Sequence, residues 1–430
     1  MTGILVLVLT FIILLAIGVP IAYSIGISGI CTMLVSMDAI PALATFAQRM
    51  ATGLDSFTLL AIPFFILAGQ LMNSGGIALR LIELAKVFVG RLPGGLSFVN
   101  VIANMLFGAI SGSAAASASA IGTIMGPQMK KENYDERHSA AINLTSATTG
   151  LIIPPSNILI VYSLASGGVS IAALFIAGYI PGILMGIALM TAGAAYAVRK
   201  KYPRMDRIPV KEAVRKFFDA LPSLLLLVIV IGGIITGIFT ATEASAVAVL
   251  YCLILAFIYR EIKWNDIPRI IIKTCITTSI VLLLVATSIG LSWIMSYENI
   301  PQDVSSGLLS ISDNPFVILL LINLILLLVG IFMDMTPAVL IFTPIFLPIV
   351  TAQLGIDPIH FGIIMIMNLC VGLCTPPVGT VLFVGCTVAR LKIHDIIRPL
   401  IPLFIIMVIV LLIVTYIPQL SLWLPGVFGY

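Results

Sequence analysis

The sequence predicts an all-α polytopic membrane protein that contains an inverted structural repeat. Hydrophobic residues make up 60% of the 430 residues and charged residues only 9%, whereas soluble domains carry roughly 25% charged residues. Paired interruptions in the hydrophobic segments of two halves are a sequence indicator of a transport site. A shift of 222 positions superimposes identical residues: Gly108 on Gly330, Asp135 on Asp357, His138 on His360, and Gly150-Leu-x-x-Pro154-Pro155 on Gly372-Leu-x-x-Pro376-Pro377.

Apolar segments long enough to cross a bilayer, about 20 residues each, follow one another along the chain. In the first half, crossings are predicted near 2–18, 21–36, 56–73, 139–166 and 170–198. In the second half, they are predicted near 218–238, 241–259, 268–296, 360–389 and 396–417. The first segment lacks a basic region and a cleavage site, so we expect a membrane helix rather than a signal peptide. One long helix kinked at Pro20 is the alternative to the first two crossings.

Two longer segments are each predicted to form a re-entrant hairpin. Segment 97–129 is broken at Gly108–Ser113, and segment 315–353 is broken at Asp334-Met-Thr-Pro337. Crossings 139–166 and 360–389 are also broken, at their Pro-Pro pairs. Backbone that leaves a helix inside the membrane is tolerated only where protein buries it or a watery cavity receives it.

Loop charges predict the orientation and the domain boundaries. The basic segment 201–217 is predicted to be a cytoplasmic linker between a first repeat, 1–200, and a second repeat, 218–430. Five crossings plus one hairpin per half is an odd number of crossings, so the second repeat is inverted. The first hairpin then opens to the cytoplasm, and the second hairpin and both termini face outside. The net charge of +4 does not indicate nucleic-acid binding, because the basic residues lie in short loops.

Two polar-striped segments, 77–91 and 302–312, occupy matching positions in the repeat. In the first, Arg80, Glu83 and Lys86 recur every three residues beside apolar positions. This pattern is typical of a helix that lies in the membrane interface, and a cytoplasmic linker helix is the alternative.

The breaks of the first half carry small residues with hydroxyl, amide and carbonyl oxygens. Such groups suit Na⁺, while the N-termini of half-helices attract anions. Close helix packing through small residues is the alternative, and we favour it for Ser117 and Ser119 but not for the breaks. The oxygen-bearing residues are Ser111 and Ser113 at the tip, with Thr145, Ser146, Thr148, Thr149, Ser156 and Asn157 in the broken helix.

In the second half, Asp334 is the acidic residue at a hairpin tip. An intramembrane acid is a functional candidate by default, and three roles stay open for Asp334: a Na⁺ ligand, a proton relay, or a cap of the following half-helix. The other candidates of this half are Thr336 and Pro337 at the tip, and Gly372, Thr375, Pro376, Pro377, Gly379 and Thr380 in the broken helix.

The remaining polar residues are interpreted as structural. Glu243 follows Thr240 at capping-box spacing. Asp135 and His138, with Asp357 and His360, are interpreted as remnants of the repeat and as N-terminal caps of the two broken helices. The six cysteines lie in apolar segments and are expected to pack there. No nucleophile motif, phosphate loop or metal-ligand pattern is present in the sequence, so we expect no catalytic residue, no cofactor and no metal besides Na⁺.

These motifs together resemble the large membrane subunit of TRAP (tripartite ATP-independent periplasmic) transporters of the DctM type. The resemblance rests on Gly108–Ala116, Gly150–Asn157, Gly237–Ala244 and Asp334–Pro337, and it covers nearly the whole chain. It implies a multi-pass protein of the bacterial inner membrane that imports an organic acid with two or more Na⁺ ions. The most similar branch is the one that transports sialic acid (N-acetylneuraminate). A self-sufficient Na⁺/dicarboxylate carrier is the alternative.

The resemblance also implies partners, a mechanism and a site. The expected partners are a small four-helix membrane subunit and a soluble periplasmic substrate-binding protein. The expected mechanism is an elevator movement, in which a transport domain that contains both hairpins slides against a scaffold. One Na⁺ site would comprise Ser111, Gly112, Ser113, Thr149, Gly150, Pro154, Ser156 and Asn157. The other would comprise Asp334, Met335, Thr336, Gly372, Thr375, Pro376, Gly379 and Thr380. Substrate contacts are expected at Ser113, Asn157, Thr336 and Thr380.

Overall fold

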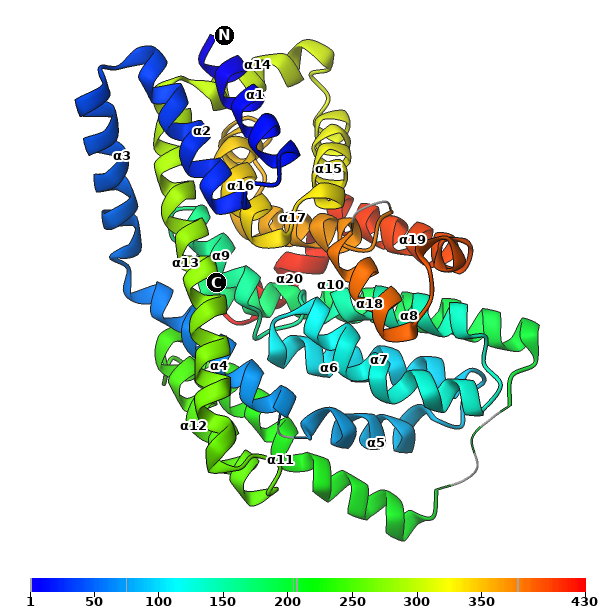
Figure 1. The fold of residues 1–430 in the computed structure, drawn as a ribbon. Helices are drawn as coiled ribbons and strands as arrows, with labels where there is room; N and C mark the ends of the chain where they lie inside the picture. The colour runs from blue at the N-terminus through cyan, green and yellow to red at the C-terminus, as the bar shows by residue number, and fades with distance from the viewer. Residues whose placement is uncertain (1, 75, 204, 206–207, 377–378) are drawn as a thin grey trace.

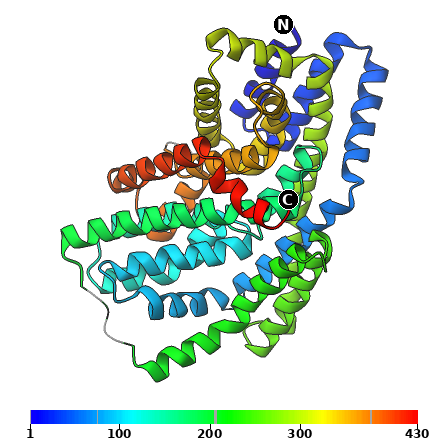
Figure 2. The ribbon, with the colours of Figure 1, turned by 180° about the vertical axis from the view of Figure 1, so that it is seen from behind.

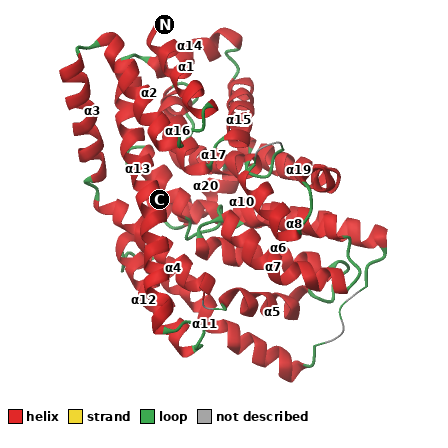
Figure 3. Ribbon diagram, viewed as in Figure 1, coloured by secondary structure: helices red, strands yellow, loops and turns green. Residues whose placement is uncertain are grey.

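The computed structural model describes residues 2–74, 76–203, 205, 208–376 and 379–430. Across these residues the regular secondary structure is helical (Figure 3). The first half comprises α1 (Thr2–Ala16), α2 (Ile21–Ser36), α3 (Ala39–Leu54), the 3-10 turn η1 (Phe57–Leu60), α4 (Ala61–Ser74), α5 (Ile77–Val89), α6 (Gly95–Ser111), α7 (Ala114–Lys131), α8 (Glu136–Thr149), α9 (Asn157–Ala165) and α10 (Ile171–Lys200).

The second half repeats this order. It comprises α11 (Val210–Ile235), α12 (Ala241–Ile258), the 3-10 turn η2 (Trp264–Asp266), α13 (Ile267–Tyr297), α14 (Ile300–Ile311), α15 (Pro315–Phe332), α16 (Met335–Ala352), α17 (Pro358–Gly372), α18 (Thr380–Ala389), α19 (Ile393–Tyr416) and α20 (Gln419–Val427). Shifted by 222 residues, helices α5 to α9 fall on α14 to α18 within a few residues.

Packing follows the same repeat. Helix α7 packs on α18 and its counterpart α16 packs on α9, while α8 packs on α19 and α17 packs on α10. At the centre, the Cys370 thiol donates to the Thr148 carbonyl oxygen at 3.3 Å, and these two positions are 222 residues apart. Two equivalent positions that touch each other lie beside the axis that relates the repeats.

The structure confirms a polytopic membrane protein. Seven described helices are long and apolar enough to cross a bilayer, or up to eight if one bent pair forms a single span. Helices α1, α2 and α14 to α16 gather at one end of the molecule, α5 and α11 lie at the other, and the long helix α13 runs between the two ends (Figures 1 and 2). The N-terminus lies at the first end, beside α14, and the C-terminus lies near the middle.

The first two predicted crossings, α1 and α2, are separate helices that are shorter than the spans counted above. A third predicted crossing differs in shape. The segment expected at 56–73 is the second arm of a bent pair, in which α3 meets η1 and α4 at 63°. Helix α3 escaped prediction because Gln48 and Arg49 interrupt its apolar run. The counterpart of the pair in the second half is the continuous helix α13.

All four predicted breaks are present. Helix α6 ends at Ser111, Gly112 adopts a left-handed φ of 61°, and α7 starts at Ala114. Helix α15 stops at Phe332, and α16 starts at Met335. The two broken helices are interrupted between α8 and α9, at Pro154 and Pro155, and between α17 and α18, where Pro377 lies outside the described residues.

The predicted basic linker 201–217 is partly helical, because α11 already begins at Val210. Lys216 forms ion pairs with Glu212 at 2.8 Å and with Glu83 of α5 at 3.0 Å. These contacts extend α11 beyond its apolar part and fasten it along α5 (Figure 1). Arg204 and Arg207 of the predicted linker lie outside the described residues.

Candidate functional site

The first hairpin tip and the first Pro-Pro loop meet. A Cβ atom built on Gly112 would lie 2.6 Å from the side-chain nitrogen of Asn157, so only glycine lets this amide pack against the tip. Ser113 caps α7, where its hydroxyl accepts from the Ala116 amide at 3.2 Å. Ser111 donates to the Ser113 carbonyl oxygen at 3.5 Å. The structure therefore brings together Ser111, Gly112, Ser113 and Asn157, as the first predicted site requires.

The other residues of this set line the break behind the tip. Thr149 donates to the Ser146 carbonyl oxygen at 2.6 Å, and Ser156 donates to the Leu151 carbonyl oxygen at 2.5 Å. Both hydroxyls are buried, and each keeps lone pairs that can accept or coordinate. Pro154 is also buried. Gly150 packs backbone to backbone on α6, since a Cβ on Gly108 would lie 2.9 Å from the Gly150 Cα.

Asp334 stands at the start of α16. Its side chain is exposed, and no side-chain capping hydrogen bond is found for it among the described residues. The carboxylate interacts with the backbone amide of Met335 at the start of α16, so both a capping role and a ligand role fit this position. Met335 is buried beneath it, and Thr336 is half-buried in the first turn of α16.

The second broken helix forms its own compact loop. Thr375 donates to the Val371 carbonyl oxygen at 2.9 Å, and the Gly379 amide donates to the Thr375 carbonyl oxygen at 3.1 Å. Gly372 packs on α15, where a Cβ built on Gly330 would lie 3.0 Å from the Gly372 Cα. Pro376 is half-buried and Thr380 is exposed. Among the described residues, no hydrogen bond joins Asp334–Thr336 to this loop.

Four half-helices begin at the breaks. Ser113, Ser156, Asp334 and Gly379 precede the first residues of α7, α9, α16 and α18. The crossed packing of α7 on α18 and of α9 on α16 links the breaks of the two repeats. Of the four predicted substrate contacts, Ser113 and Asn157 belong to the joined first tip, and Thr336 and Thr380 lie in the first turns of α16 and α18. Helix N-termini carry partial positive charge, which favours an anion nearby.

A buried amide cluster behind the first tip was missed by the sequence analysis. The Asn104 side chain donates to the side-chain oxygens of Asn100 at 2.8 Å, Asn143 at 3.1 Å and Ser146 at 2.9 Å. It also accepts from the Ser117 hydroxyl at 2.7 Å. The signal was the spacing of Asn100 and Asn104 by four residues in an apolar helix, since side-chain amides join helices inside membranes. The bond of Ser117 fits its predicted packing role.

A second, smaller cluster joins the corresponding helices of the other half. Asn368 of α17 donates to the side-chain oxygen of Asn323 in α15. Asn323 in turn donates to the Thr415 hydroxyl of α19 at 3.3 Å. Each hairpin is thus fastened to its neighbouring broken helix by buried side-chain amides.

The predicted structural roles of the charged residues are confirmed. Asp135 accepts from the Arg137 amide at 2.9 Å, and Asp357 accepts from the Ile359 amide at 2.7 Å, so both cap their helices. Thr240 and Glu243 form the expected capping box.

The two repeat-related histidines differ from each other. The ring of His138 stacks on Tyr196 with centroids 3.8 Å apart. His360 instead shares a hydrogen bond of 2.6 Å with Ser421. Neither histidine is a helix cap, because Asp135 and Asp357 take that role.

Repeated apolar helices, two hairpins, two broken helices and oxygen-rich breaks define a membrane carrier. The chain belongs to the family described as the tripartite ATP-independent periplasmic transporter, DctM component, which it matches over residues 8–420. It is a transporter permease and not an enzyme. The family serves secondary transport of organic acids, together with a small membrane subunit and a periplasmic binding protein.

Several relatives agree with this assignment, and a solved structure shares the fold. The chain is 57% identical to uncharacterized protein YgiK of Salmonella typhimurium, over 99% of this chain and 98% of that protein. It is 41% identical to the C4-dicarboxylate TRAP transporter large permease protein DctM of Pseudomonas aeruginosa, over 94% of each. It is 39% identical to the sialic acid TRAP transporter large permease protein SiaM of Vibrio cholerae, over 97% of each. The YdaH transporter of Alcanivorax borkumensis shares the fold, with a TM-score of 0.66 over 91% of this chain and 90% of that chain, at 13% identity.

Proposed function

We propose that this subunit imports an organic acid across the bacterial inner membrane in symport with Na⁺, after a periplasmic binding protein delivers the substrate. The proposed substrate is N-acetylneuraminate. The sialic acid and C4-dicarboxylate relatives are similar to the chain to nearly the same degree, 39% and 41%. A test of the substrate therefore includes both kinds of acid.

The observation that carries this proposal is the pair of oxygen-rich breaks. At the first break, the Asn157 amide packs against Gly112, which lies between Ser111 and Ser113 in the chain, and Thr149 and Ser156 of the adjoining loop are buried. At the second, Asp334 leaves its carboxylate exposed. We assign one Na⁺ to each break, because carbonyl, hydroxyl and carboxylate oxygens are the ligands that unwound transporter helices offer to cations.

The substrate carboxylate would lie between the breaks. The tip and loop sequences 108–116, 149–157, 333–337 and 372–380 contain no Lys or Arg, so bound Na⁺ and the four half-helix N-termini balance its charge. Two Na⁺ with one monoanion carry a net charge of +1 inward. A membrane potential of about 100 mV then contributes about 2.3 kcal/mol to uptake.

An elevator movement is supported by how the first tip meets α4. A Cβ built on Gly69 of α4 would lie 2.8 Å from the Ser111 carbonyl oxygen, so α4 and the tip touch through backbone atoms. A glycine at such a contact removes side chains that would interlock. In the proposed cycle, the hairpins and broken helices slide along a scaffold that includes α4, and the breaks keep their Na⁺ and substrate.

The test is uptake into proteoliposomes that hold the chain with its small subunit. N-acetylneuraminate and succinate are supplied with an inward Na⁺ gradient, with and without the binding protein. Uptake of N-acetylneuraminate that needs both Na⁺ and the binding protein is the expected result. Uptake with Na⁺ alone would favour the self-sufficient carrier, uptake of succinate alone would remove the sialic acid assignment, and electroneutral uptake would contradict the proposed stoichiometry.

A further inference from the structure

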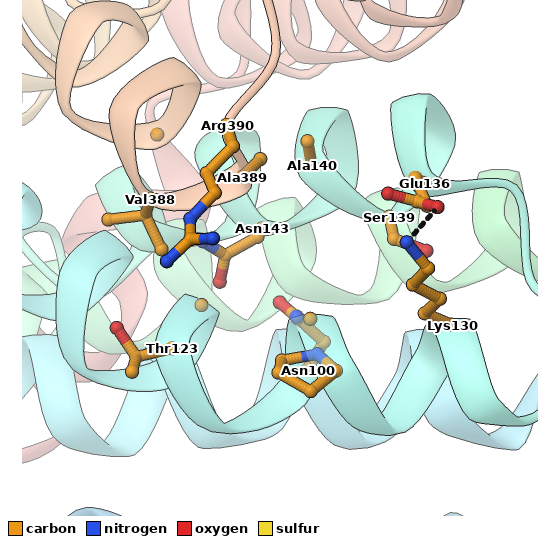
Figure 4. Close-up of a pocket in the computed structure, with 14 residues that line it drawn as sticks. Asn100, Thr123, Lys130, Glu136, Ser139, Ala140, Asn143, Val388, Ala389 and Arg390 are labelled. Atoms are coloured by element: carbon orange, nitrogen blue, oxygen red, sulfur yellow. Dashed lines mark ion pairs between the residues drawn. The ribbon is translucent and has the colours of Figure 1, made fainter.

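A cavity of about 620 Å³, lined by both polar and apolar residues, lies away from the tips, between the base of the first hairpin and the end of α18 (Figure 4). Helices α6, α7 and α8 form its walls, and Arg390 reaches into it from the end of α18. A helix rises about 1.5 Å per residue, so Arg390 lies about 15 Å along α18 from Thr380. The volume is within the range of small-molecule sites, roughly 300–1,000 Å³.

The charges around the cavity favour an anion. Lys130 and Glu136 line it, and they neutralise each other in an ion pair of 2.8 Å. The Arg390 guanidinium has no ion-pair partner among the residues that the structure describes. Arg390 therefore leaves one positive charge in the cavity, and a guanidinium can bind a carboxylate through two parallel hydrogen bonds.

Hydrogen-bond donors without acceptors point to the same kind of ligand. Ser139 lines the cavity with only 6% of its surface exposed, and its hydroxyl has no partner in the described part of the chain. Asn100 uses its side-chain oxygen to accept from Asn104 and Ser146, and no acceptor for its amide nitrogen is found among the described residues. A buried polar group without a partner is costly, and the oxygens of a bound organic acid would accept from both side chains.

The cavity also connects to the interior. Its wall residues Asn100 and Asn143 belong to the amide cluster that Asn104 joins behind the first tip. Its mouth lies beside the loop between α7 and α8, which the basic residues Lys130, Lys131 and Arg137 predict to be cytoplasmic. The cavity thus lies on the inner side of the proposed substrate position.

We propose that this cavity is a second anion site, which binds the carboxylate of the transported organic acid on the cytoplasmic side after its release from the tips. The assignment rests on the proposed function, because the ligand is the cargo of the carrier. Arg390 anchors the carboxylate on the side of the cavity where Asn143 and Val388 lie (Figure 4). Ser139, beside the Lys130–Glu136 pair, and Asn100 donate to other oxygens of the acid. Among the described lining residues, Glu136 carries the one carboxylate, and Lys130 neutralises it. The site therefore needs no Na⁺ to offset a negative charge in its wall.

The test measures binding to the chain and its small subunit in nanodiscs of neutral phosphatidylcholine. N-acetylneuraminate, succinate and inorganic phosphate are titrated by calorimetry, with and without Na⁺. We expect a Na⁺-dependent site and a weaker, Na⁺-independent carboxylate site. Arg390→Gln should weaken the second site at least tenfold, Arg390→Lys should weaken it less, and Ser139→Ala should weaken it a few-fold.

Two controls make the result specific. Arg199→Gln removes an exposed positive charge at the end of α10 and should leave both sites unchanged. Asp334→Ala should remove the Na⁺-dependent site alone. If the wild-type protein shows the Arg390-dependent site but no Na⁺-dependent binding, the proposed Na⁺ coupling is refuted and the cavity assignment stands.

Other outcomes would overturn the assignment. Full carboxylate binding by the Arg390→Gln protein would exclude Arg390 as the anchor. Inorganic phosphate that binds more tightly than the carboxylates would identify a phosphate site instead. Loss of the weak site in nanodiscs that contain phosphatidylglycerol would show that a lipid headgroup occupies the cavity.

Discussion

Asp334 occupies a helix N-cap position and is also the candidate Na⁺ ligand of the second break. It takes the N-cap position of α16, yet its side chain is exposed and makes no capping hydrogen bond in the described structure. Ser113, at the matching break of the first half, does cap its helix. The exposed carboxylate interacts with the Met335 amide, and its remaining lone pairs are those that the proposed Na⁺ would use.

Asp334→Ala should therefore lower Na⁺-dependent uptake by roughly tenfold or more, because every 1.4 kcal/mol of lost ion binding corresponds to a factor of ten. Initial rates at graded Na⁺ concentrations measure the effect. Asp303→Ala, which removes an exposed carboxylate from α14, should keep the wild-type rate. Wild-type Na⁺ dependence in the Asp334→Ala protein would remove Asp334 from the site.

At the scale of elements, glycines hold each hairpin against its broken helix. A Cβ built on Gly150 would lie 2.5 Å from the Gly108 Cα, and one built on Gly372 would lie 2.6 Å from the Gly330 Cα. These neighbours are backbone atoms, which cannot rotate away as a side chain can. The same contact in both repeats sets the distance between helices that carry the breaks.

Gly150→Ala and Gly372→Ala should each destabilise the protein by about 1–3 kcal/mol, the usual cost of an overpacked contact. The midpoint of thermal unfolding in detergent measures the loss. Gly307→Ala is the matched control, because nothing lies within 4 Å of a Cβ at that position of α14. An unchanged midpoint for Gly372→Ala would show that α15 and α17 can separate without cost.

The contact between α5 and α11 predicts a dependence on pH. Burial by itself would raise the pKa of Glu83, but hydrogen bonds and charges from Lys86 and Lys216 outweigh burial and lower this pKa below its ordinary 4.5. A lowered pKa means that the ionised carboxylate stabilises the folded state. This stabilisation is fully present above pH 4.5 and is lost as the pH falls through the folded-state pKa.

Glu83→Gln should remove that part of the acid sensitivity. Its thermal unfolding midpoint should therefore change less than that of the wild type between about pH 6 and about pH 4. Thermal unfolding over this range is the measurement. Glu132→Gln, an exposed position after α7, should keep the wild-type slope. Equal slopes for the Glu83→Gln protein and the wild type would show that the ion pairs do not hold α5 on α11.

At the scale of the whole molecule, the inverted orientation of the two halves can be tested directly. Asn133 is exposed in the loop after the first hairpin, and Asp313 is exposed in the loop before the second. Basic residues surround Asn133, so we predict that it faces the cytoplasm and that Asp313 faces outside. Asn133→Cys and Asp313→Cys, each in a background without the native cysteines, should react with an impermeant maleimide from opposite sides. Labelling of both from one side would contradict the inverted repeat.

The sequence predicts the fold best where a residue decides the backbone by itself. Gly112 and the pair Pro154-Pro155 interrupt helices because of their own geometry, and all four breaks lie where they were expected. The sequence predicts less well where distant contacts decide. The early start of α11 depends on the pairing of Lys216 with Glu83, and α3 has too few consecutive apolar residues to be recognised.

The site shows the same division. The first tip and loop were predicted together, and Gly112 and Asn157 do meet. The amide cluster around Asn104 joins residues up to 46 positions apart, and only the folded chain reveals it. The cavity joins Asn100 to Arg390 across the two repeats, a distance that no local sequence pattern covers.

The contact between Cys370 and Thr148 bears on how the two repeats evolved. In a symmetric dimer, a residue beside the two-fold axis meets its own copy from the other subunit. Thr148 and Cys370 stand in this relation, with the Cys370 sulfur 3.3 Å from the Thr148 carbonyl oxygen. A half-length ancestor that paired with an inverted copy of itself would have met the same restriction, because a large side chain at this position would collide with its twin. Gene duplication and fusion would free each position to change alone, and today one is a threonine and the other a cysteine.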